Sequence, residues 1–278
     1  MKPESLPVFC LAGPTAVGKS AIALALAQQI GGEIVSVDSM QVYRGLDIGT
    51  AKPTAADRAR VRHHLIDVVD LTCGFDASQF VRLAAAAVSD IQARGRSPIF
   101  CGGPGLYFKA WFEGLPEIPP ADPRLRAELE ATPLPVLLDE LAARDRTTFE
   151  TIDQRNPRRV VRALEVIRLS GRPLSAQRAD RRAPMPGDPA GAAQVVVFRR
   201  APEDLRARIN ARVDAMFAAG LIEETRRLLT AGLGENRTAM QALGYRQVIE
   251  HLRGERDLAQ TIALVKLKTW QFARRQMT

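Results

Sequence analysis

Hydrophobic and polar positions in the first 110 residues alternate between two patterns. Short apolar runs with the length of buried strands occur at 8–12, 33–37 and 98–101, with a weaker one near 64–68. Stretches with helical spacing occur at 19–29 and 76–94, and a third begins near residue 105. Because strands and helices alternate along the chain, the pattern predicts a parallel sheet flanked by helices, an α/β fold.

The pattern changes near residue 115. Residues 115–120, LPEIPP, are typical of a linker, helical periodicity dominates from 121 to about 182, and a stretch rich in Pro, Gly and Ala follows at 183–193. A further strand is then predicted at 194–198, with helices at 202–219, 221–231 and 256–276. We therefore expect two domains: residues 1–115 plus 194–278 form the catalytic domain, and residues 116–193 form a helical insertion.

A phosphate-binding motif lies between the first predicted strand and the first predicted helix. The motif G-x-x-x-x-G-K-[ST] is matched by Gly13, Pro14, Thr15, Ala16, Val17, Gly18, Lys19 and Ser20. In this context the backbone N–H groups of the loop point at an anion, Lys19 reaches its outer phosphates, and the Ser20 hydroxyl ligates Mg²⁺. The motif predicts a P-loop NTPase-like sheet that binds a diphosphate or a nucleotide such as ATP, but it does not define the reaction.

Composition and charge limit the partners. The net charge of +8 and the pI near 9.9 favour a polyanionic partner, although a solvated basic surface would give the same balance. Three cysteines without paired spacing are typical of reduced thiols in a cytosolic protein. The N-terminus has no signal-peptide core, and no stretch has transmembrane length. We therefore expect a cytoplasmic monomer with no membrane partner.

The predicted insertion is rich in arginine and contains no lysine. On a continuous helix Arg155, Arg159 and Arg162 would share one face, with Arg158 and Arg162 four residues apart. Planar guanidinium groups suit phosphate recognition, yet a solvated face paired with Glu165 would carry the same residues. Composition alone leaves both interpretations open.

Asp38 follows the predicted strand 33–37 and has several possible roles. In a P-loop small-molecule kinase it would orient an acceptor hydroxyl, and the helical insertion would act as a lid. It is equally suited to forming a turn or to supporting a Mg²⁺ site indirectly. The phosphate loop and Asp38 are therefore compatible with a kinase until longer motifs are considered.

The segment from Asp38 to Pro53, DSMQVYRGLDIGTAKP, resembles the signature that follows the phosphate loop in tRNA dimethylallyltransferases, also called tRNA isopentenyltransferases. Further segments resemble that family in the same order, at 102–107, 156–165, 242–247 and 273–278. The resemblance spans nearly the whole chain, and the first segment is much longer than the phosphate loop motif.

This resemblance implies transfer of a dimethylallyl group from dimethylallyl diphosphate to N6 of the adenosine immediately 3′ of the anticodon in tRNA. The phosphate loop would hold the diphosphate leaving group with Mg²⁺, and Asp38 would be the catalytic base that accepts a proton from N6. The adenine would be flipped out of its stack, and the insertion would lie along the anticodon stem. The kinase reading remains the alternative, and it predicts ADP release that depends on an acceptor.

The resemblance also implies a set of tRNA-contacting positions. They are Asp38, Ser39, Met40, Gln41, Pro104, Arg126, Arg158, Arg159, Val160, Val161, Arg162, Gln241, Ala242, Leu243, Gly244, Tyr245 and Arg246. Tyr245 is suited either to stacking on a base or to anchoring a helix. Pro104 departs from the family, which generally has a threonine there, and proline offers neither a hydroxyl nor an N–H. We expect Pro104→Thr to keep or raise turnover.

Overall fold

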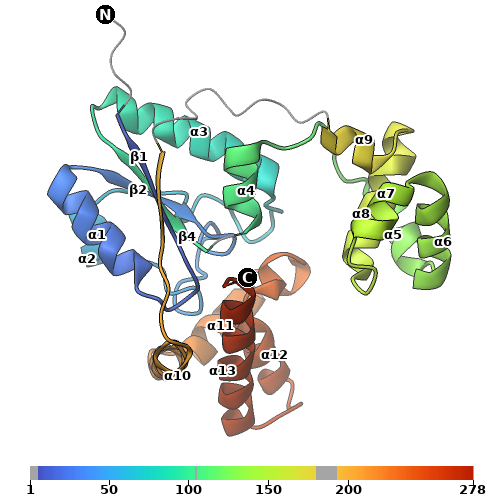
Figure 1. Cartoon of the computed structure of the whole chain (residues 1–278). Helices are drawn as coiled ribbons and strands as arrows, with labels where there is room; N and C mark the ends of the chain where they lie inside the picture. The colour runs from blue at the N-terminus through green and yellow to red at the C-terminus, as the bar shows by residue number, and fades with distance from the viewer. Residues whose placement is uncertain (1–5, 104, 180–192, 278) are drawn as a thin grey trace, which may run out of the picture. The chain divides into compact units, whose positions relative to one another are not determined.

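The computed structural model describes residues 6–103, 105–179 and 193–277. The chain forms two compact units, one from Met1–Phe112 with Pro186–Thr278 and one from Glu113–Met185, shown in Figure 1. Each unit has its own buried core and is described separately below.

The first unit is built on a five-stranded sheet. Its strands are β1 (Val8–Ala12), β2 (Glu33–Val37), β3 (His63–His64), β4 (Pro98–Gly102) and β5 (Ala193–Val197). They are ordered β3-β2-β4-β1-β5, and every pairing is parallel. This confirms the predicted P-loop NTPase-like α/β fold. Because parallel strands all end at one edge, the loops after β1, β2 and β4 meet there.

Helices cover both faces of the sheet (Figure 1). Those of the N-terminal half are α1 (Lys19–Ile30), α2 (Ala55–Arg60), α3 (Ala77–Ala93) and α4 (Leu106–Glu113). Helix α1 places Ala23 and Ala27 against Leu11, Ile34 and Ile99 of the strands. These small residues let α1 lie close to the sheet, which fixes the phosphate loop at its N-terminus.

Two details near the β3 edge differ from the prediction. Only His63 and His64 pair with β2, because Leu65 and Asp67 have positive φ angles of 60° and 56° that end the predicted strand 64–68. The short helix α2 was not predicted. Its six residues, AADRAR, have no buried stripe, and it depends on a capping box between Thr54 and Asp57.

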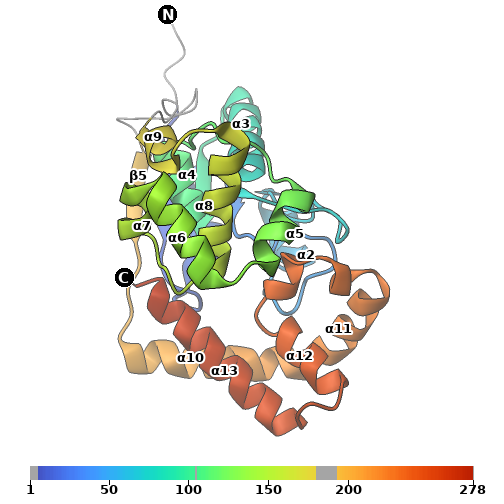
Figure 2. The same ribbon diagram turned by 90° about the vertical axis from the view of Figure 1, so that its right-hand side faces the viewer.

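The C-terminal helices form a layer beside the phosphate loop. They are α10 (Pro202–Ala218), α11 (Leu221–Thr230), α12 (Tyr245–Leu252) and α13 (Leu258–Arg275), with 3₁₀ turns η1 (Leu233–Glu235) and η2 (Ala239–Gln241). Helices α10 and α13 cross (Figure 2), and Leu205, Ile209 and Val213 pack with Val265 and Ala273. Val17 of the phosphate loop belongs to the same cluster, so these helices are fixed to the loop.

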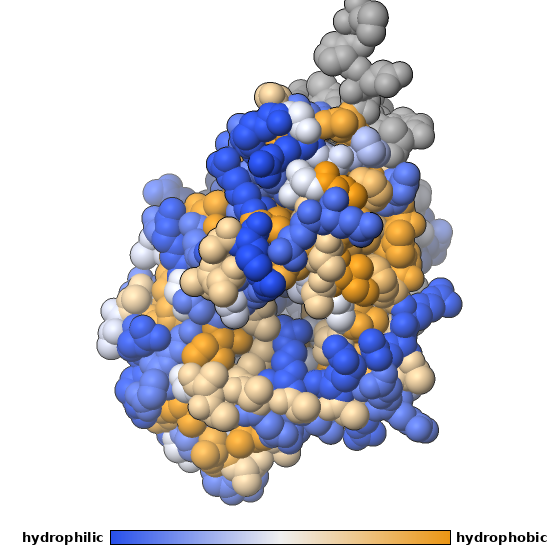
Figure 3. Space-filling model, turned by 90° about the vertical axis from the view of Figure 1, so that its left-hand side faces the viewer, coloured by the Kyte–Doolittle hydropathy of each residue, from blue (hydrophilic) through white to orange (hydrophobic). Residues whose placement is uncertain are grey.

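The edge strand β5 leaves apolar side chains on the surface. Val195, Val196 and Val197 are exposed, and Val196 borders a hollow of about 520 Å³ whose other walls include Ile22 and Phe198. Figure 3 shows the face that includes α1, where hydrophobic residues gather in patches between charged ones. Within the residues that the structure describes, no helix is both long and apolar enough to cross a membrane.

The second unit is helical. It contains α5 (Pro123–Ala131), α6 (Leu134–Arg144), α7 (Arg146–Thr151), α8 (Pro157–Ser170) and α9 (Leu174–Ala179). Helix α8 is central, because Val160, Leu164 and Ile167 are buried among residues of α5 and α6. The helix begins at Pro157, so the prediction that Arg155 shares a helical face with Arg159 and Arg162 was wrong. Proline disfavours a helical conformation in the residue before it.

Candidate active site

The phosphate loop turns sharply between β1 and α1. Gly13, Ala16 and Gly18 have φ angles of 153°, 64° and 110°. Gly13 also lies against Phe198, the residue after β5, since a Cβ on Gly13 would be 2.8 Å from the Phe198 carbonyl oxygen. A residue with a side chain would push these two segments apart, which explains the requirement for glycine.

Lys19 is buried inside the loop. Its Nζ donates hydrogen bonds of 2.7 Å to the carbonyl oxygens of Gly13 and Pro14. Burial lowers the pKa of Lys19 to about 8; nearby Arg212 lowers it further, whereas Cys101 and Asp38 oppose the shift. Lys19 begins α1 after the loop, Asp38 directly follows β2 and Cys101 lies near the end of β4, so all three belong to the same edge of the sheet.

Asp38 extends directly from the end of β2. Its Oδ1 accepts hydrogen bonds from the backbone N–H groups of Met40, at 2.8 Å, and Gln41, at 3.2 Å. Its Oδ2 accepts no hydrogen bond from any residue that the structure describes. One carboxylate oxygen therefore fixes the turn, while the other can accept a proton.

Gln41 connects this turn to residues 50 and 51 of the long motif. Its Oε1 accepts from the Ser36 hydroxyl at 2.9 Å, and its Nε2 donates to the Thr50 carbonyl at 3.1 Å. Gln41 is thus held at both ends of its amide, and its backbone N–H holds Asp38. The side chain is placed to orient the turn around Asp38 rather than to move freely.

Three arginines next to the phosphate loop were not predicted as site residues. Arg208 Nε donates to the Ala16 carbonyl at 2.9 Å, and Arg200 Nε donates to the Val17 carbonyl at 3.3 Å. Arg212 donates to Thr15 Oγ1 at 3.2 Å and to the Thr50 carbonyl at 3.4 Å. Burial lowers the pKa of Arg212, and the nearby Asp38 opposes that shift. Arg208 and Arg212 are one helical turn apart on α10, a spacing visible in the sequence.

The end of α13 also reaches the phosphate loop. Gln276 Oε1 accepts a 2.8 Å hydrogen bond from the Thr15 backbone N–H. Gly103, after β4, lies under the same side chain, since a Cβ there would be 2.1 Å from Gln276 Nε2. Three separate segments therefore meet at this point. Pro104, which was predicted as a tRNA-contacting position and stands where the family generally has threonine, lies outside the described residues.

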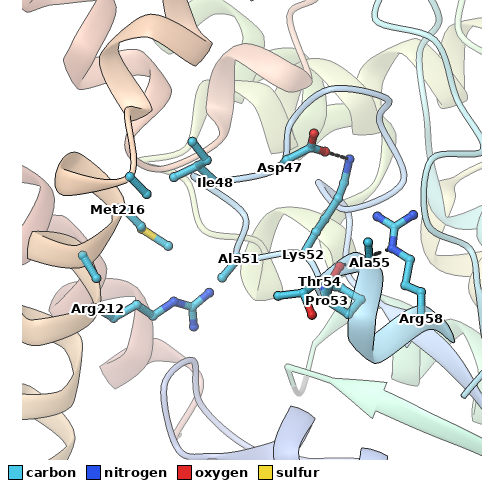
Figure 4. Close-up of a pocket in the computed structure, with 12 residues that line it drawn as sticks. Asp47, Ile48, Ala51, Lys52, Pro53, Thr54, Ala55, Arg58, Arg212 and Met216 are labelled. Carbon is cyan, nitrogen blue, oxygen red and sulfur yellow. Dashed lines mark hydrogen bonds and ion pairs between the residues drawn. The ribbon is translucent and has the colours of Figure 1, made fainter. Parts of the chain in front are cut away.

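A hollow of about 550 Å³ opens beside Arg212 (Figure 4). One wall is apolar and comes from α10 and the loop 47–51, with Ala215, Met216 and Ile48 among its residues. The opposite wall carries Lys52 and Arg58, both paired with Asp67. Arg212 lines the hollow and also contacts the phosphate loop, so it links the two.

In the helical unit, two of the predicted tRNA-contacting arginines are paired. Arg126 and Arg162 both form ion pairs with Glu165, a fully buried carboxylate, at 2.7 and 2.6 Å. Arg158 and Arg159 are exposed on the first turn of α8 and have no ion-pair partner among the described residues. Pairing with Glu165, one of the two interpretations of the sequence, therefore holds for Arg162, whereas phosphate recognition by Arg158 and Arg159 stays a prediction.

Several other predicted tRNA-contacting positions are buried. Val160, Val161 and Ala242 are at most 4% exposed, so their side chains serve helix packing. Tyr245 is fully buried and its hydroxyl donates to Glu224, so stacking on a base was wrong and anchoring of its helix is correct. The remaining positions with at least partial exposure in this set include Gln241, Leu243 and Arg246. Gly244 starts α12 at a φ of 94°.

The histidines after α2 are structural. His64 Nε2 lies 2.6 Å from Glu33 Oε2, and His63 Nδ1 lies 2.8 Å from the Val61 carbonyl oxygen. In the described part of the chain, no three His, Cys, Asp or Glu residues are grouped in a way that would hold a metal ion. None of the three cysteines, all within the described residues, forms a disulfide.

Comparison with known proteins gives the family. The family model described as IPP transferase matches residues 41–278. The chain belongs to the IPP transferase family. It is 44% identical to the tRNA dimethylallyltransferase 1 of Citrifermentans bemidjiense, covering 100% of this chain and 90% of that protein. It is 46% identical to the tRNA dimethylallyltransferase of Halorhodospira halophila, covering 98% of this chain and 89% of that protein.

Solved structures agree with this assignment. The full-length tRNA isopentenylpyrophosphate transferase of Bacillus halodurans is 36% identical, with a TM-score of 0.68 over 97% of this chain and 85% of that one. A eukaryotic dimethylallyltransferase, solved in snapshots of its action on tRNA, is 28% identical, with a TM-score of 0.82 over 97% of this chain and 68% of that one. The resemblance found in the sequence is confirmed, and these relatives support the transferase rather than the kinase reading.

Proposed function

We propose that this protein transfers a dimethylallyl group from dimethylallyl diphosphate to N6 of the adenosine immediately 3′ of the anticodon in tRNA. The observation that carries the proposal is the placement of Asp38 beside the phosphate loop. Arg212 donates to Thr15 of the loop and to the Thr50 carbonyl, and Gln41, whose backbone N–H holds Asp38, donates to the same carbonyl. An anion held by the loop would therefore have its reacting end close to a carboxylate base.

The diphosphate is held as a leaving group. Loop N–H groups, Lys19 and Arg212 would bind its oxygens, and Arg208 adds positive charge beside the loop, whereas Arg200 is paired with Asp204. As the C1–O bond of the donor breaks, the electron pair stays on the diphosphate, and these groups stabilise the growing negative charge. They are positioned before the reaction, since backbone and side-chain contacts already fix each of them.

The new bond forms between N6 and C1 of the dimethylallyl group. The N6 lone pair attacks C1, and the nitrogen then loses a proton, which the second oxygen of the Asp38 carboxylate is placed to accept. An exocyclic amine is a weak nucleophile, so orientation by Asp38 contributes along with its basicity. The charge of the system is balanced when the proton resides on Asp38 and the electron pair on the diphosphate.

The residues present fit a Mg²⁺ ion that is held mainly by the substrate. Ser20 is an exposed residue in the first turn of α1, and the described residues contain no carboxylate-rich cage. Mg²⁺ commonly binds through a few protein oxygens plus substrate phosphates and water. When bound, it would neutralise part of the diphosphate charge. Ser20 is the side chain proposed to hold it.

We further propose that tRNA reaches the site by presenting a flipped adenine. The residues Asp38 to Gln41 and Gln241 to Arg246 belong to the first unit, and Arg126 and Arg158 to Arg162 belong to the helical unit. Exposed Arg158 and Arg159 are free of ion pairs within the described chain and would contact phosphates. We expect the enzyme to act as a cytoplasmic monomer.

The test is incubation of the purified chain with Mg²⁺, dimethylallyl diphosphate and unmodified tRNA that has adenosine 3′ of the anticodon. Nucleosides are then analysed by mass. The proposal predicts a prenyl mass gain on adenosine that is absent with Asp38→Ala. A second tRNA in which that adenosine is replaced by guanosine is the matched control. No mass gain on the first tRNA would contradict the proposal.

A further inference from the structure

Two buried polar side chains near the site take no part in the reaction proposed above. Glu224 of α11 is 2% exposed and Tyr245 of α12 is fully buried. The Tyr245 hydroxyl donates a 2.5 Å hydrogen bond to Glu224 Oε1. Burial raises the pKa of Tyr245, and Glu224 raises it further, so the phenol stays a proton donor.

The partners of this pair lie on the loop of the long motif. The backbone N–H of Ile48 donates to both carboxylate oxygens of Glu224, at 2.9 and 3.0 Å. The N–H of Gly49 donates to the Tyr245 hydroxyl at 3.1 Å. A Cβ on Gly49 would lie 2.4 Å from Cε2 of the Tyr245 ring, so only glycine lets the loop lie against that ring. Helices α11 and α12 therefore fix the backbone at residues 48 and 49.

The next residue connects this backbone to the site. The Thr50 carbonyl accepts from Gln41 Nε2 at 3.1 Å and from Arg212 Nη2 at 3.4 Å. Gln41 in turn donates its backbone N–H to Asp38, and Arg212 donates to Thr15 of the phosphate loop. One carbonyl oxygen thus touches both the group that orients the base and the cation beside the leaving group.

We propose that Glu224 and Tyr245 are positioning residues for the transfer. They hold residues 48 and 49 so that the Thr50 carbonyl sets the positions of Gln41 and Arg212, and through them those of Asp38 and the diphosphate. This inference rests on the proposed function for its catalytic part. Its binding part, the placement of Arg212 toward a diphosphate, is measurable without any transfer.

The main variant is Tyr245→Phe, which removes one oxygen and keeps the ring. The matched control is Thr225→Val, beside Glu224 on the same helix. Thr225 is fully buried and donates a 2.7 Å hydrogen bond to the Leu221 carbonyl, so valine removes a buried hydrogen bond without touching the loop. Both variants should lower the melting temperature of the protein. Only Tyr245→Phe should also change diphosphate binding and catalysis.

Three quantities are measured for the wild type and both variants: affinity for inorganic diphosphate with Mg²⁺, KM for dimethylallyl diphosphate, and kcat at saturating tRNA. Tyr245→Phe should weaken diphosphate affinity, raise the donor KM and lower kcat, each by about tenfold, the effect of one lost buried hydrogen bond. Thr225→Val should leave all three unchanged. Gly49→Ala, which pushes the loop from the ring, should reproduce the effect of Tyr245→Phe.

The inference would be overturned if Tyr245→Phe kept the wild-type diphosphate affinity, donor KM and kcat. It would also be overturned if Thr225→Val showed the same losses as Tyr245→Phe. If the wild type transfers no prenyl group, the proposed function fails, while the diphosphate affinities still test the placement of Arg212. Should Tyr245→Phe fail to fold, Glu224→Gln replaces it. It keeps one acceptor oxygen for the loop, and the inference then predicts an intermediate loss in diphosphate affinity with near-normal folding.

Discussion

Arginines of the two units are compensated in different ways. At the sheet edge, Arg208 and Arg212 donate to backbone carbonyls and a threonine hydroxyl, none of which carries a full negative charge. In the helical unit, Arg126 and Arg162 face the buried carboxylate of Glu165. The first arrangement leaves positive charge available for an anion, whereas the second neutralises it inside the fold.

The charge of the acceptor distinguishes arginines that can bind a ligand from arginines that stabilise the fold. A guanidinium held by neutral acceptors is oriented but not neutralised, so its field is available to a phosphate. A guanidinium paired with a buried carboxylate mainly prevents that carboxylate from being left alone in the core. The sequence predicted phosphate contacts for arginines of the insertion, yet the arginines that contact the phosphate loop are Arg200 and, on α10, Arg208 and Arg212.

The largest expected effect is on Asp38. Asp38→Ala should reduce kcat by roughly 10²- to 10⁴-fold, because the transition state loses its proton acceptor and the amine its orientation. Affinity for inorganic diphosphate should stay within a few fold, since the loop and its cations remain. Single-turnover kinetics together with calorimetric binding measure both. Equal losses in kcat and diphosphate affinity would mean that Asp38 holds the loop instead.

The next largest effect is expected at Arg212, which is held by neutral acceptors rather than by a buried carboxylate. Arg212→Met should weaken diphosphate affinity by about 10- to 100-fold, the effect of losing one or two charge-assisted hydrogen bonds. Arg206→Met is its control, since Arg206 lies on the same helix but over the Trp270 ring, 6.0 Å from the ring centre. The control should bind diphosphate normally.

Arg162→Met should behave in the opposite way. Diphosphate affinity should not change, and the free energy of unfolding should fall by about 1 to 3 kcal/mol, because Glu165 loses one of its donors and keeps Arg126. Denaturant titration measures this. A loss of diphosphate affinity without a loss of stability would contradict the comparison.

Lys19 should make the affinity for diphosphate depend on pH. With a pKa of about 8, it is charged below that pH and neutral above it. Affinity for diphosphate should therefore decline as the pH rises through 8, by up to about tenfold per unit. Since diphosphate itself titrates, Lys19→Met is measured in parallel, and the ratio of the two affinities is compared. A ratio that stays constant from pH 6.5 to 9.5 would show that Lys19 is not the titrating group.

The smallest effect is expected at the exposed arginines of α8. Arg158→Ala and Arg159→Ala should each weaken tRNA binding only a few fold and reduce the salt dependence of log K by about one. Stability should not change, because neither side chain is paired within the described chain. Binding at several salt concentrations tests this. An unaltered slope in both variants would remove these residues from the tRNA interface.

Much of the fold was predictable because its signals are local. The phosphate loop lies between an apolar run and a helix, and the strands at 8–12, 33–37 and 98–101 are short and mostly apolar. β3 was placed too far along the chain because Leu65 and Asp67 adopt positive φ, which their residue types do not predict. Helix α2 was missed because a cap rather than a buried stripe defines it.

Only the site residues that belong to sequence motifs were predictable. Asp38 and Lys19 follow from motifs close in sequence, whereas Arg212 contacts Thr15 across 197 residues and Gln276 contacts Thr15 across 261. Such contacts depend on how α10 and α13 pack on the loop. The burial of Tyr245 has the same origin, because the partner of its hydroxyl, Glu224, lies on another helix.

The most direct test offers the enzyme a prenyl donor and a phosphoryl donor at once. The chain is incubated with Mg²⁺, unmodified tRNA, and equal concentrations of dimethylallyl diphosphate and ATP, and released diphosphate, ADP and prenylated adenosine are counted. We predict that one diphosphate is released for each prenylated adenosine and that no ADP is formed. ADP release that depends on an acceptor, with no prenyl gain on tRNA, would contradict it and identify a kinase.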